Sequence, residues 1–292
     1  MAVVEDAFDS FKPDFVFVRN AWSLSRRAAR AARRRGVPAL LYNQLPVIQN
    51  TSVLRQAELL WKGLPRRRVT PVAGLPPQVG HDPWAMYLPW PVAALPSPDP
   101  MPKPKGKLHL VCVGKLGLPR KNQPLLIKAM EAAGLQSLYH LTLIGTAPKE
   151  HKPGQYEQAQ LMADLSTRDW ITMHPNVPFP QMGNIHASAD VSILPSFAEP
   201  LGTSPIEAMA YGSVPVISSD CGSAGYLTDG QNGFVIDMTR PDSATNALRK
   251  LATDDAMRQR MSQAARQTAE TELSEARFIE RLNALLMAHG VT

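Results

Sequence analysis

The chain has 292 residues, of which 44% are hydrophobic and 19% are charged, and its formal net charge at pH 7 is +6. This length and composition predict about two globular domains, each with its own core. No apolar run approaches the roughly 18 residues of a membrane-spanning helix, and the acidic start is unlike a secretory signal. Two cysteines exclude a disulfide framework and are typical of a reducing cytoplasm.

Basic residues are concentrated in the first third of the chain. Residues 1–106 contain 15 Lys and Arg against 7 Asp and Glu, whereas the remainder contains 16 against 18. This asymmetry favours contact with polyanions or with an anionic membrane surface. A basic module that binds a polyanion is therefore one alternative, but no helix-turn-helix or pattern of interleaved aromatic and basic residues accompanies the charge, and we expect no nucleic acid partner.

The first predicted elements form a strand–helix–strand unit. Phe15–Val18 and Ala39–Tyr42 are predicted strands, and Ser23–Arg35 between them is a predicted helix that ends at a glycine. Such a unit implies two parallel strands joined by a right-handed crossover.

The helix predicted over Ser23–Arg35 is rich in arginine. Arg27, Arg30 and Arg34 share one face, opposite a face of alanines. A solvated crossover helix explains this pattern. Electrostatic contact with anionic lipid headgroups also explains it, at about 1 kcal/mol for each basic residue near the membrane surface.

A proline-rich segment separates two parts of the chain. Residues 43–94 predict one short strand at Val69–Val72 and otherwise irregular structure. The next segment contains five prolines, which neither a helix nor a central strand accommodates. We therefore predict an α/β lobe over 1–94, a connector over 95–106 and a second domain over 107–292.

Strands and helices alternate in the second domain, which predicts a doubly wound parallel sheet. The predicted strands are Leu108–Val113, His140–Ile144, Trp170–Met173, Val191–Leu194, Val214–Ser218 and Phe234–Ile236. The predicted helices are Gln123–Ala133, Gln155–Ser166, Gln181–Ala189, Ser204–Tyr211, Ser243–Ala252, Asp255–Glu270 and Leu273–Ala288.

The stretch 195–212 carries the strongest chemical signal. It follows the predicted strand Val191–Leu194, and a loop of small residues leads into a helix that opens at Ser204. Free backbone N–H groups and the helix dipole at such a point favour an anion. Glu199 and Glu207 would repel a phosphate but accept hydrogen bonds from hydroxyls, so the combination predicts a nucleotide-sugar site.

Glu207 also has a purely structural interpretation. Ser204 and Glu207 have the spacing of a capping box, in which the glutamate satisfies N–H groups of its own helix. This box does not explain Glu199, and both interpretations of Glu207 remain open.

A second loop, Gly114–Asn122, follows the first strand of this domain. It matches neither a P-loop nor a dinucleotide-binding fingerprint. Lys115 and Lys121 follow the carboxyl end of a strand, where open α/β sheets bind ligands, and their charges suit a diphosphate. The alternative is an exposed basic loop without a ligand.

Neither a metal site nor a nucleophile–base set stands out. The seven histidines are scattered, no Asp-x-Asp ends a strand, and no serine lies in a Gly-x-Ser-x-Gly elbow. We therefore expect no metal and no other cofactor.

From Leu108 onward the chain resembles the retaining glycosyltransferases of family 4, which have the GT-B fold. The segments that carry the resemblance occur in the family's order. They are Val113-Gly-Lys-Leu116 with Lys121, Leu141-Thr-Leu-Ile-Gly145, Ala189-Asp-Val-Ser-Ile-Leu-Pro-Ser196, Glu199 with Glu207, Glu207-Ala-Met-Ala-Tyr-Gly212 and Asp229-Gly-Gln-Asn-Gly233. Lys115 stands where the family usually has an arginine.

The resemblance implies a hexosyltransferase that takes a sugar from a nucleotide-diphosphate sugar and passes it, with retention of configuration, to a glycan or lipid-linked acceptor. Glu207 would hold the donor ribose, and Glu199 and Lys121 would be the catalytic residues at the donor sugar and diphosphate. The donor-binding residues that it implies are Gly114, Lys115, Lys121, Asn176, Val177, Pro178, Glu199, Gly202, Thr203, Ser204 and Glu207. It also implies catalysis without a metal and a last helix that packs on the first domain.

Residues 1–94 are similar only to the later part of the family's first lobe, because no initial strand with a glycine-rich loop precedes Gly36. We therefore expect a GT-B-like fold with a Rossmann-like second domain and an incomplete N-terminal α/β lobe. A nucleotide-sugar-binding or partner protein without turnover is the alternative to a transferase. The expected location is the cytoplasm, with peripheral contact at the inner membrane face as an option.

Overall fold

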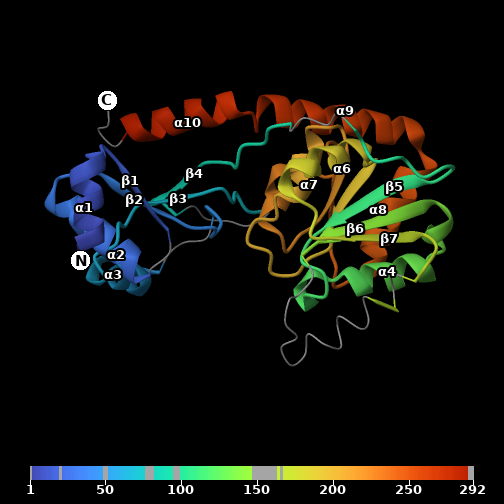
Figure 1. Cartoon of the computed structure of the whole chain (residues 1–292), viewed down its shortest axis with the longest axis horizontal. Coiled ribbons are helices and arrows are strands. Elements are labelled where there is room, and N and C mark those ends of the chain that lie inside the picture. The colour runs from blue at the N-terminus through green and yellow to red at the C-terminus, as the bar shows by residue number, and fades with distance from the viewer. Residues whose placement is uncertain are drawn as a thin grey trace. The chain divides into compact units, whose positions relative to one another are not determined.

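The computed structural model describes residues 2–19, 22–48, 52–75, 82–94, 99–146, 163–164 and 167–288. The chain forms two compact units (Figure 1). The first combines Met1–Pro91 with Glu275–Thr292, and the second comprises Val92–Ser274. Among the helices of the described residues, none is long and apolar enough to cross a bilayer.

The first unit is built on a four-stranded parallel sheet in the order β1-β2-β3-β4. Its strands are β1 (Val16–Arg19), β2 (Ala39–Tyr42), β3 (Arg68–Thr70) and β4 (Ala85–Tyr87). Its helices are α1 (Ala2–Phe11), α2 (Ser23–Arg34), α3 (Val53–Trp61) and α10 (Glu275–Met287). The predicted strand–helix–strand unit is confirmed, because β1 and β2 pair in parallel and α2 connects them.

The prediction of irregular structure over 43–94 is wrong for α3 and β4. Ser52 caps α3, since its hydroxyl accepts a hydrogen bond from the Arg55 N–H at 3.2 Å. Leu59 is the one buried residue of this helix, whose other large apolar residues, Val53, Leu54, Leu60 and Trp61, are exposed. β4 has three residues, which is too short for an alternating pattern.

Small side chains allow α2 to pack closely in the first unit. Ala31 and Ala32 are fully buried in a cluster with apolar residues of α1. Arg34, the last residue of α2, and Arg35, its C-cap, both form ion pairs with Glu5 of α1. The basic face predicted for this helix is therefore partly neutralised.

The last helix packs in the first unit, which differs from the predicted second domain of 107–292. Leu285 of α10 is buried in a cluster with Leu40, Val69 and Leu88. This is the packing that the family resemblance implied for the last helix. Its physical cause is an apolar stripe at helical spacing, formed by Phe278, Leu282, Leu285 and Leu286.

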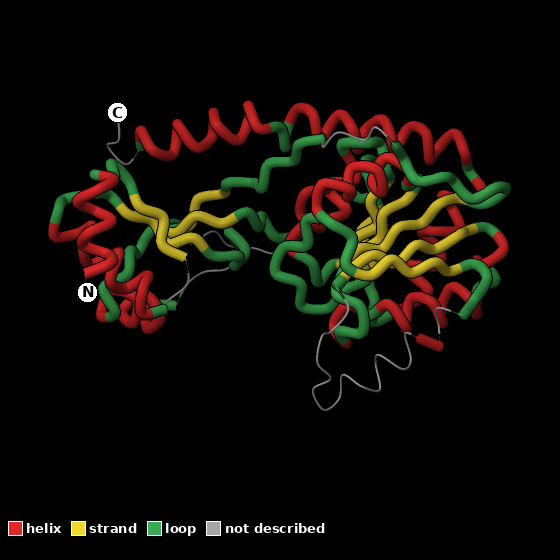
Figure 2. The backbone as a smooth tube through the Cα atoms, in the orientation of Figure 1, coloured by secondary structure: helices red, strands yellow, loops and turns green. Residues whose placement is uncertain are grey.

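The second unit contains a six-stranded parallel sheet in the order β10-β9-β8-β5-β6-β7 (Figure 2). The strands are β5 (Leu108–Val113), β6 (Tyr139–Gly145), β7 (Ile171–Pro175), β8 (Val191–Leu194), β9 (Val214–Ser218) and β10 (Phe234–Ile236). The doubly wound sheet predicted from the sequence is confirmed. The strand order reverses between β5 and β8, and ligands of such sheets bind at the carboxyl ends of the strands on either side of that point.

Helices cover both faces of this sheet. They are α4 (Gln123–Ala132), α6 (Met182–Ser188), α7 (Ser204–Met209), α8 (Pro241–Thr253) and α9 (Asp255–Thr271). Alternate residues of β5 face opposite layers, because Leu110 and Cys112 lie in one cluster with α4 and α8, whereas Val111 packs with Ile185 of α6. The helix predicted over Gln155–Ser166 lies almost wholly outside the described residues.

Candidate donor site of the second unit

Two loops meet where the strand order of the second unit reverses. One loop follows β5 and the other follows β8, and the Phe197 N–H donates a hydrogen bond to the Arg120 carbonyl at 2.8 Å. Across this junction the Lys121 Nζ lies 2.6 Å from the Glu199 Oε2. The two residues that the sequence singled out as catalytic are thus brought into direct contact.

The pair of Lys121 and Glu199 is shielded from water. Their side chains are 11% and 12% exposed, whereas that of Arg120, which contacts the same carboxylate oxygen at 2.5 Å, is 40% exposed. Charges at such a depth attract one another more strongly than surface charges do. Two cations therefore hold the Glu199 carboxylate from one side.

The backbone also fixes Glu199. Its N–H donates to the Asp220 carbonyl at 3.1 Å, and its carbonyl accepts from the Gly222 N–H at 3.0 Å, which ties the loop to the segment after β9. Gly202 closes the loop with φ +79°, and a Cβ at that position would lie 2.4 Å from the Leu194 Cδ2. The loop therefore requires glycine at Gly202 for its backbone conformation and for space.

A chain of close backbone contacts links the loop after β5 to the end of β7. A Cβ at Gly145 would lie 1.8 Å from the Gly114 carbonyl oxygen, so the two backbones meet where β5 and β6 end. The Gly145 carbonyl in turn accepts a hydrogen bond from the Asn176 N–H at 2.8 Å. Asn176 has φ +58°, which turns the chain at the end of β7.

Three other predicted donor residues, Val177, Pro178 and Lys115, differ in how deeply they are buried. Val177 is half-buried beside the cluster of Val111 and Ile185, and Pro178 precedes a short 3-10 turn. Lys115 is exposed, and the Lys121 side chain passes over Gly114, at which a Cβ would lie 3.2 Å from the Lys121 Cδ.

Of the two interpretations left open for Glu207, the capping box with Ser204 does not form. Thr203 is the N-cap of α7, and no side chain makes a capping hydrogen bond at that end. Ser204 is the first helical residue, and its buried hydroxyl has no hydrogen-bond partner among the described residues. The Glu207 carboxylate therefore forms no capping box with Ser204, and its partner in its own helix is the hydroxyl of Thr203.

Glu207 instead faces a histidine that the sequence analysis did not single out. His186 of α6 is 2% exposed, and its Nε2 lies 3.7 Å from the Glu207 Oε2. Burial raises the pKa of Glu207, but the His186 imidazole and the Thr203 hydroxyl lower it by more, so that its pKa lies below the usual value. His186 reaches Glu207 because α6 packs on α7. Sequence spacing does not reveal this packing, so His186 could not be predicted from the sequence.

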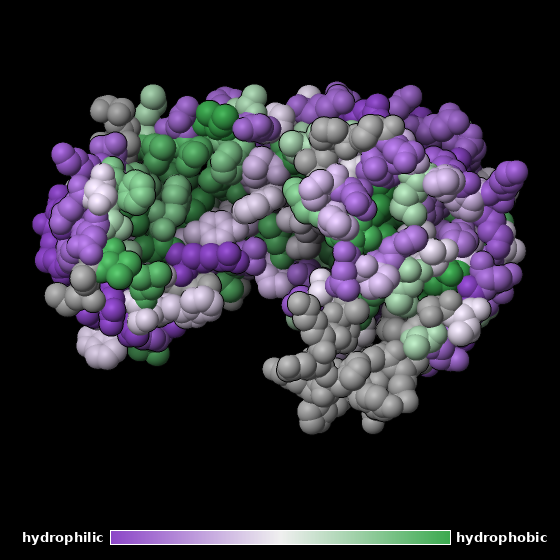
Figure 3. All heavy atoms as spheres, in the orientation of Figure 1, coloured by the Kyte–Doolittle hydropathy of each residue, from purple (hydrophilic) through white to green (hydrophobic). Residues whose placement is uncertain are grey.

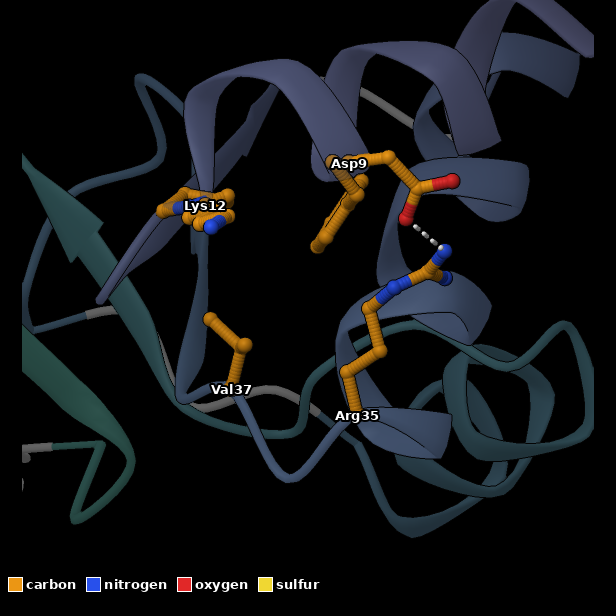
Figure 4. Close-up of a pocket in the computed structure, with 6 residues that line it drawn as sticks. Asp9, Lys12, Arg35 and Val37 are labelled. Atoms are coloured by element: carbon orange, nitrogen blue, oxygen red, sulfur yellow. Dashed lines mark hydrogen bonds and ion pairs between the residues drawn. The ribbon is translucent and has the colours of Figure 1, made fainter.

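A separate pocket of about 460 Å³ lies in the first unit (Figure 4). An ion pair between Arg35 and Asp9 at 2.9 Å lies at its wall, and Lys12, Pro13 and Val37 also line it. Pro13 and Val37 precede β1 and β2, so the pocket lies at the amino ends of these strands. Open α/β sheets bind ligands at the opposite ends, and we assign this pocket no donor residue.

In the described part of the chain, metal-ligating side chains do not gather at the junction. Among the described residues, no group of three or more His, Cys, Asp and Glu side chains is placed to hold a metal ion. Cys112 and Cys221 are both buried as free thiols.

Comparison with known proteins identifies a family and relatives of this chain. Residues 97–268 match the family model described as glycosyl transferases group 1. The chain is 29% identical over 167 residues to a D-inositol 3-phosphate glycosyltransferase of Arthrobacter sp. (strain FB24), a match that covers 56% of this chain and 38% of the relative. It is 31% identical over 196 residues to the GDP-mannose-dependent alpha-(1-6)-phosphatidylinositol monomannoside mannosyltransferase of Mycolicibacterium smegmatis, covering 62% of this chain and 47% of the relative.

These matches span less than half the length of either relative. Solved structures resemble more of the chain. HepE of Anabaena in complex with UDP-glucose has a TM-score of 0.74 at 15% identity and covers 98% of this chain and 81% of its own. Sucrose-phosphate synthase of Thermosynechococcus elongatus has a TM-score of 0.70 at 16% identity, with 97% and 76% covered. These likenesses show a fold of the GT-B type.

Proposed function

Because the chain belongs to the glycosyl transferases group 1 family, we propose that it transfers a sugar from a nucleotide-diphosphate sugar to an acceptor. The observation that carries this proposal is the contact of Lys121 with Glu199 at the point where the sheet order reverses. HepE, which has the same fold, was solved with UDP and with UDP-glucose, which supports a nucleotide-sugar donor.

In this proposal, the loop after β5 and the start of α7 bind the donor diphosphate. Lys115 and Lys121 supply positive charge, and backbone or hydroxyl groups contact the phosphates at Gly114, Gly202, Thr203 and Ser204. The unpartnered Ser204 hydroxyl supports this assignment, because a buried hydroxyl without a partner is costly unless a ligand satisfies it. Asn176, Val177 and Pro178 lie along the base at the end of β7.

The two glutamates bind hydroxyl groups of the donor. Glu207 accepts hydrogen bonds from the ribose, and Glu199 contacts the sugar that is transferred. Glu207 suits this role because it is ionised at neutral pH and because a third of its side chain is exposed. Ionised carboxylates accept hydrogen bonds and donate none, which matches the hydroxyls of a sugar.

The proposed reaction breaks the bond between the sugar anomeric carbon and the diphosphate oxygen, and it forms a bond to an acceptor hydroxyl with retention of configuration. Negative charge develops on the departing diphosphate. Lys121 stabilises that charge as a fixed cation in a site shielded from water, and we propose that it does so without a metal ion or another cofactor. The proton of the acceptor hydroxyl leaves with the diphosphate.

We also propose that the first unit contacts an anionic membrane on its cytoplasmic side, where a glycan or lipid-linked acceptor is presented. Hydrophobic and hydrophilic residues lie side by side on the surface of this unit (Figure 3). Leu54 and Trp61 of α3, which directly precede Arg55 and Lys62 in the sequence, are 84% and 81% exposed. The mycolicibacterial relative is named for a phosphatidylinositol monomannoside, which supports a lipid-linked acceptor. Binding to vesicles with and without anionic lipid, measured by flotation, tests this contact.

Two experiments test the function. The first is calorimetric titration with UDP, GDP and ADP, and the second is incubation with the corresponding radiolabelled nucleotide-sugars. Binding of one nucleoside diphosphate and release of that nucleotide from its sugar are the expected results. Binding without release or transfer would instead support the alternative of a nucleotide-sugar-binding protein, which the family match does not favour. No binding of any of the three would contradict the proposal.

A further inference from the structure

His186 is a buried histidine of the second unit. Its side chain is 2% exposed, and neither Nδ1 nor Nε2 makes a hydrogen bond to another of the described residues. A buried polar group without a partner costs about 1–3 kcal/mol, so a position that only fills the core would favour an apolar residue. His109, another buried histidine of this unit, shows the contrast, because both its ring nitrogens have partners, at 3.1 Å and 2.7 Å.

The ring of His186 is held in one orientation. It stacks on the ring of Tyr211, with centroids 5.9 Å apart and an angle of 30° between the planes. Tyr211 follows α7, whereas His186 comes from α6, so the stack joins the two elements that lead into and out of β8. In this orientation the His186 Nε2 faces the Glu207 Oε2 at 3.7 Å.

The Glu207 side chain has protein groups on one side of its carboxylate and is partly exposed to solvent. His186 and the Thr203 hydroxyl both act on its carboxyl group, and a third of the Glu207 side chain remains exposed. The distance of 3.7 Å between the His186 Nε2 and the Glu207 Oε2 is longer than a hydrogen bond. Contact geometry of this kind often tightens only when a ligand is bound.

We propose that His186 is a positioning residue, which holds the Glu207 carboxylate in the rotamer that accepts hydrogen bonds from the ribose hydroxyls of the donor nucleotide. This inference rests on the proposed function, because it assigns Glu207 to the ribose. The His186 Nε2–H donates to the Glu207 Oε2, and the exposed part of the carboxylate receives the hydroxyls. No proton is transferred, and His186 does not touch the donor.

Two variants test this role by calorimetry with the nucleoside diphosphate, among UDP, GDP and ADP, that the wild-type protein binds. His186→Phe keeps a ring that can stack on Tyr211 but removes both nitrogens, and Glu207→Gln removes the charged acceptor. Each substitution is expected to weaken binding by about 10-fold, the lower end for loss of a hydrogen bond to a charged group. The double variant is expected to bind no more weakly than Glu207→Gln alone, because the two residues act as one unit.

The 2′-deoxy form of the same nucleotide gives a readout that a structural role would not change. The wild-type protein is expected to prefer the ribose form, and His186→Phe is expected to lose most of that preference. His186→Gln, which restores an N–H donor at similar reach, is expected to recover part of it. His140→Phe is the matched control, because His140 contacts Thr172 at 2.8 Å and not Glu207. This variant is expected to bind the ribose and the 2′-deoxy nucleotide within twofold of wild type.

The outcomes separate this inference from the proposed function. One result would overturn the inference alone: Glu207→Gln binds weakly, whereas His186→Phe keeps wild-type binding and ribose preference. Fully additive losses of affinity in the double variant would also overturn it. Unchanged binding in Glu207→Gln would overturn the role of Glu207 itself. Thermal unfolding and circular dichroism show whether each variant is folded, and His186→Gln decides the question if His186→Phe does not fold.

Discussion

The Lys121 Nζ lies 2.6 Å from the Glu199 Oε2, although the two residues are 78 positions apart in the sequence. The two strands are neighbours at the point where the strand order reverses. The loops that follow them therefore meet at the carboxyl ends of β5 and β8. A cation and an anion at this point provide complementary groups for a diphosphate and for sugar hydroxyls.

Removing the charge of Lys121 tests whether this cation acts on the diphosphate. Lys121→Met is expected to lower the rate of sugar transfer by about 100-fold or more, the usual effect of losing one group that stabilises developing charge. Glu199 keeps Arg120 as an ion-pair partner, so the fold is expected to survive. Lys128→Met on the exposed surface of α4 is the control, and equal rates for the two variants would contradict the assignment.

Gly202 and Gly134 separate the effects of backbone strain and crowding. Both have positive φ, at +79° and +71°, but a Cβ at Gly134 meets nothing within 4 Å, whereas one at Gly202 would lie 2.4 Å from Leu194 and 3.0 Å from Glu199. Gly134→Ala is expected to lower the free energy of unfolding by about 1 kcal/mol. Gly202→Ala is expected to lower it by roughly 1–3 kcal/mol more, because Leu194 and Glu199 must move.

Urea denaturation of the two glycine variants measures this difference. Crowding at Gly202 would also displace Glu199, so weaker nucleotide binding is expected for Gly202→Ala and not for Gly134→Ala. Equal unfolding free energies for the two variants would mean that the loop after β8 adapts without cost.

The two cysteines are expected to be chemically inert in the folded protein. Burial raises the pKa of Cys112 to about 12, and burial together with the nearby Glu199 carboxylate raises the pKa of Cys221 to about 12. The thiolate is the reactive form, so neither residue should react at pH 8. A thiol assay with a chromogenic disulfide is expected to detect no thiol in native protein and two after denaturation; fast reaction of one thiol in the native state would show that its site opens.

The stability of the second unit is expected to fall in mild acid. Burial lowers the pKa of His109 in the folded state, although the Ser188 carbonyl partly opposes this effect. The unfolded chain therefore binds the proton first as the pH drops below about 6.5, and the free energy of unfolding decreases from there until the folded pKa is reached.

His109→Gln removes this titration and is expected to flatten the dependence of the unfolding free energy on pH as the pH falls below about 6.5. The measurement is the urea midpoint of wild type and variant across that range. Above pH 7 the histidine is neutral in both states, so the wild-type stability there is expected to be independent of this group. A variant that loses stability in acid as steeply as the wild type would place the responsible group elsewhere.

The strands of the second unit were predicted well because each is a short apolar run bounded by polar or small residues. β5, β8, β9 and β10 have the predicted bounds, and the doubly wound order follows from their alternation with helices. The first unit was harder to predict, since α3 has only nine residues and β4 only three.

Part of the site was visible in the sequence for the same reason. Lys121 and Glu199 each follow a recognisable strand, so their meeting could be predicted from topology. The failure of the capping box at Ser204 depends on where α7 begins, and the contact of His186 with Glu207 depends on how α6 packs on α7. Neither can be predicted from sequence spacing, because the first depends on the exact helix boundary and the second on packing between helices.

The central claim is that the junction after β5 and β8 binds the diphosphate of a nucleotide-sugar. Calorimetric titration of the wild-type protein with UDP, GDP and ADP tests it most directly, with Lys121→Met titrated in parallel. We expect saturable binding of at least one of the three nucleotides and a dissociation constant raised by about 10-fold or more in Lys121→Met, as for loss of a hydrogen bond to a charged group. Absence of binding to all three, or equal affinity in Lys121→Met, would contradict it.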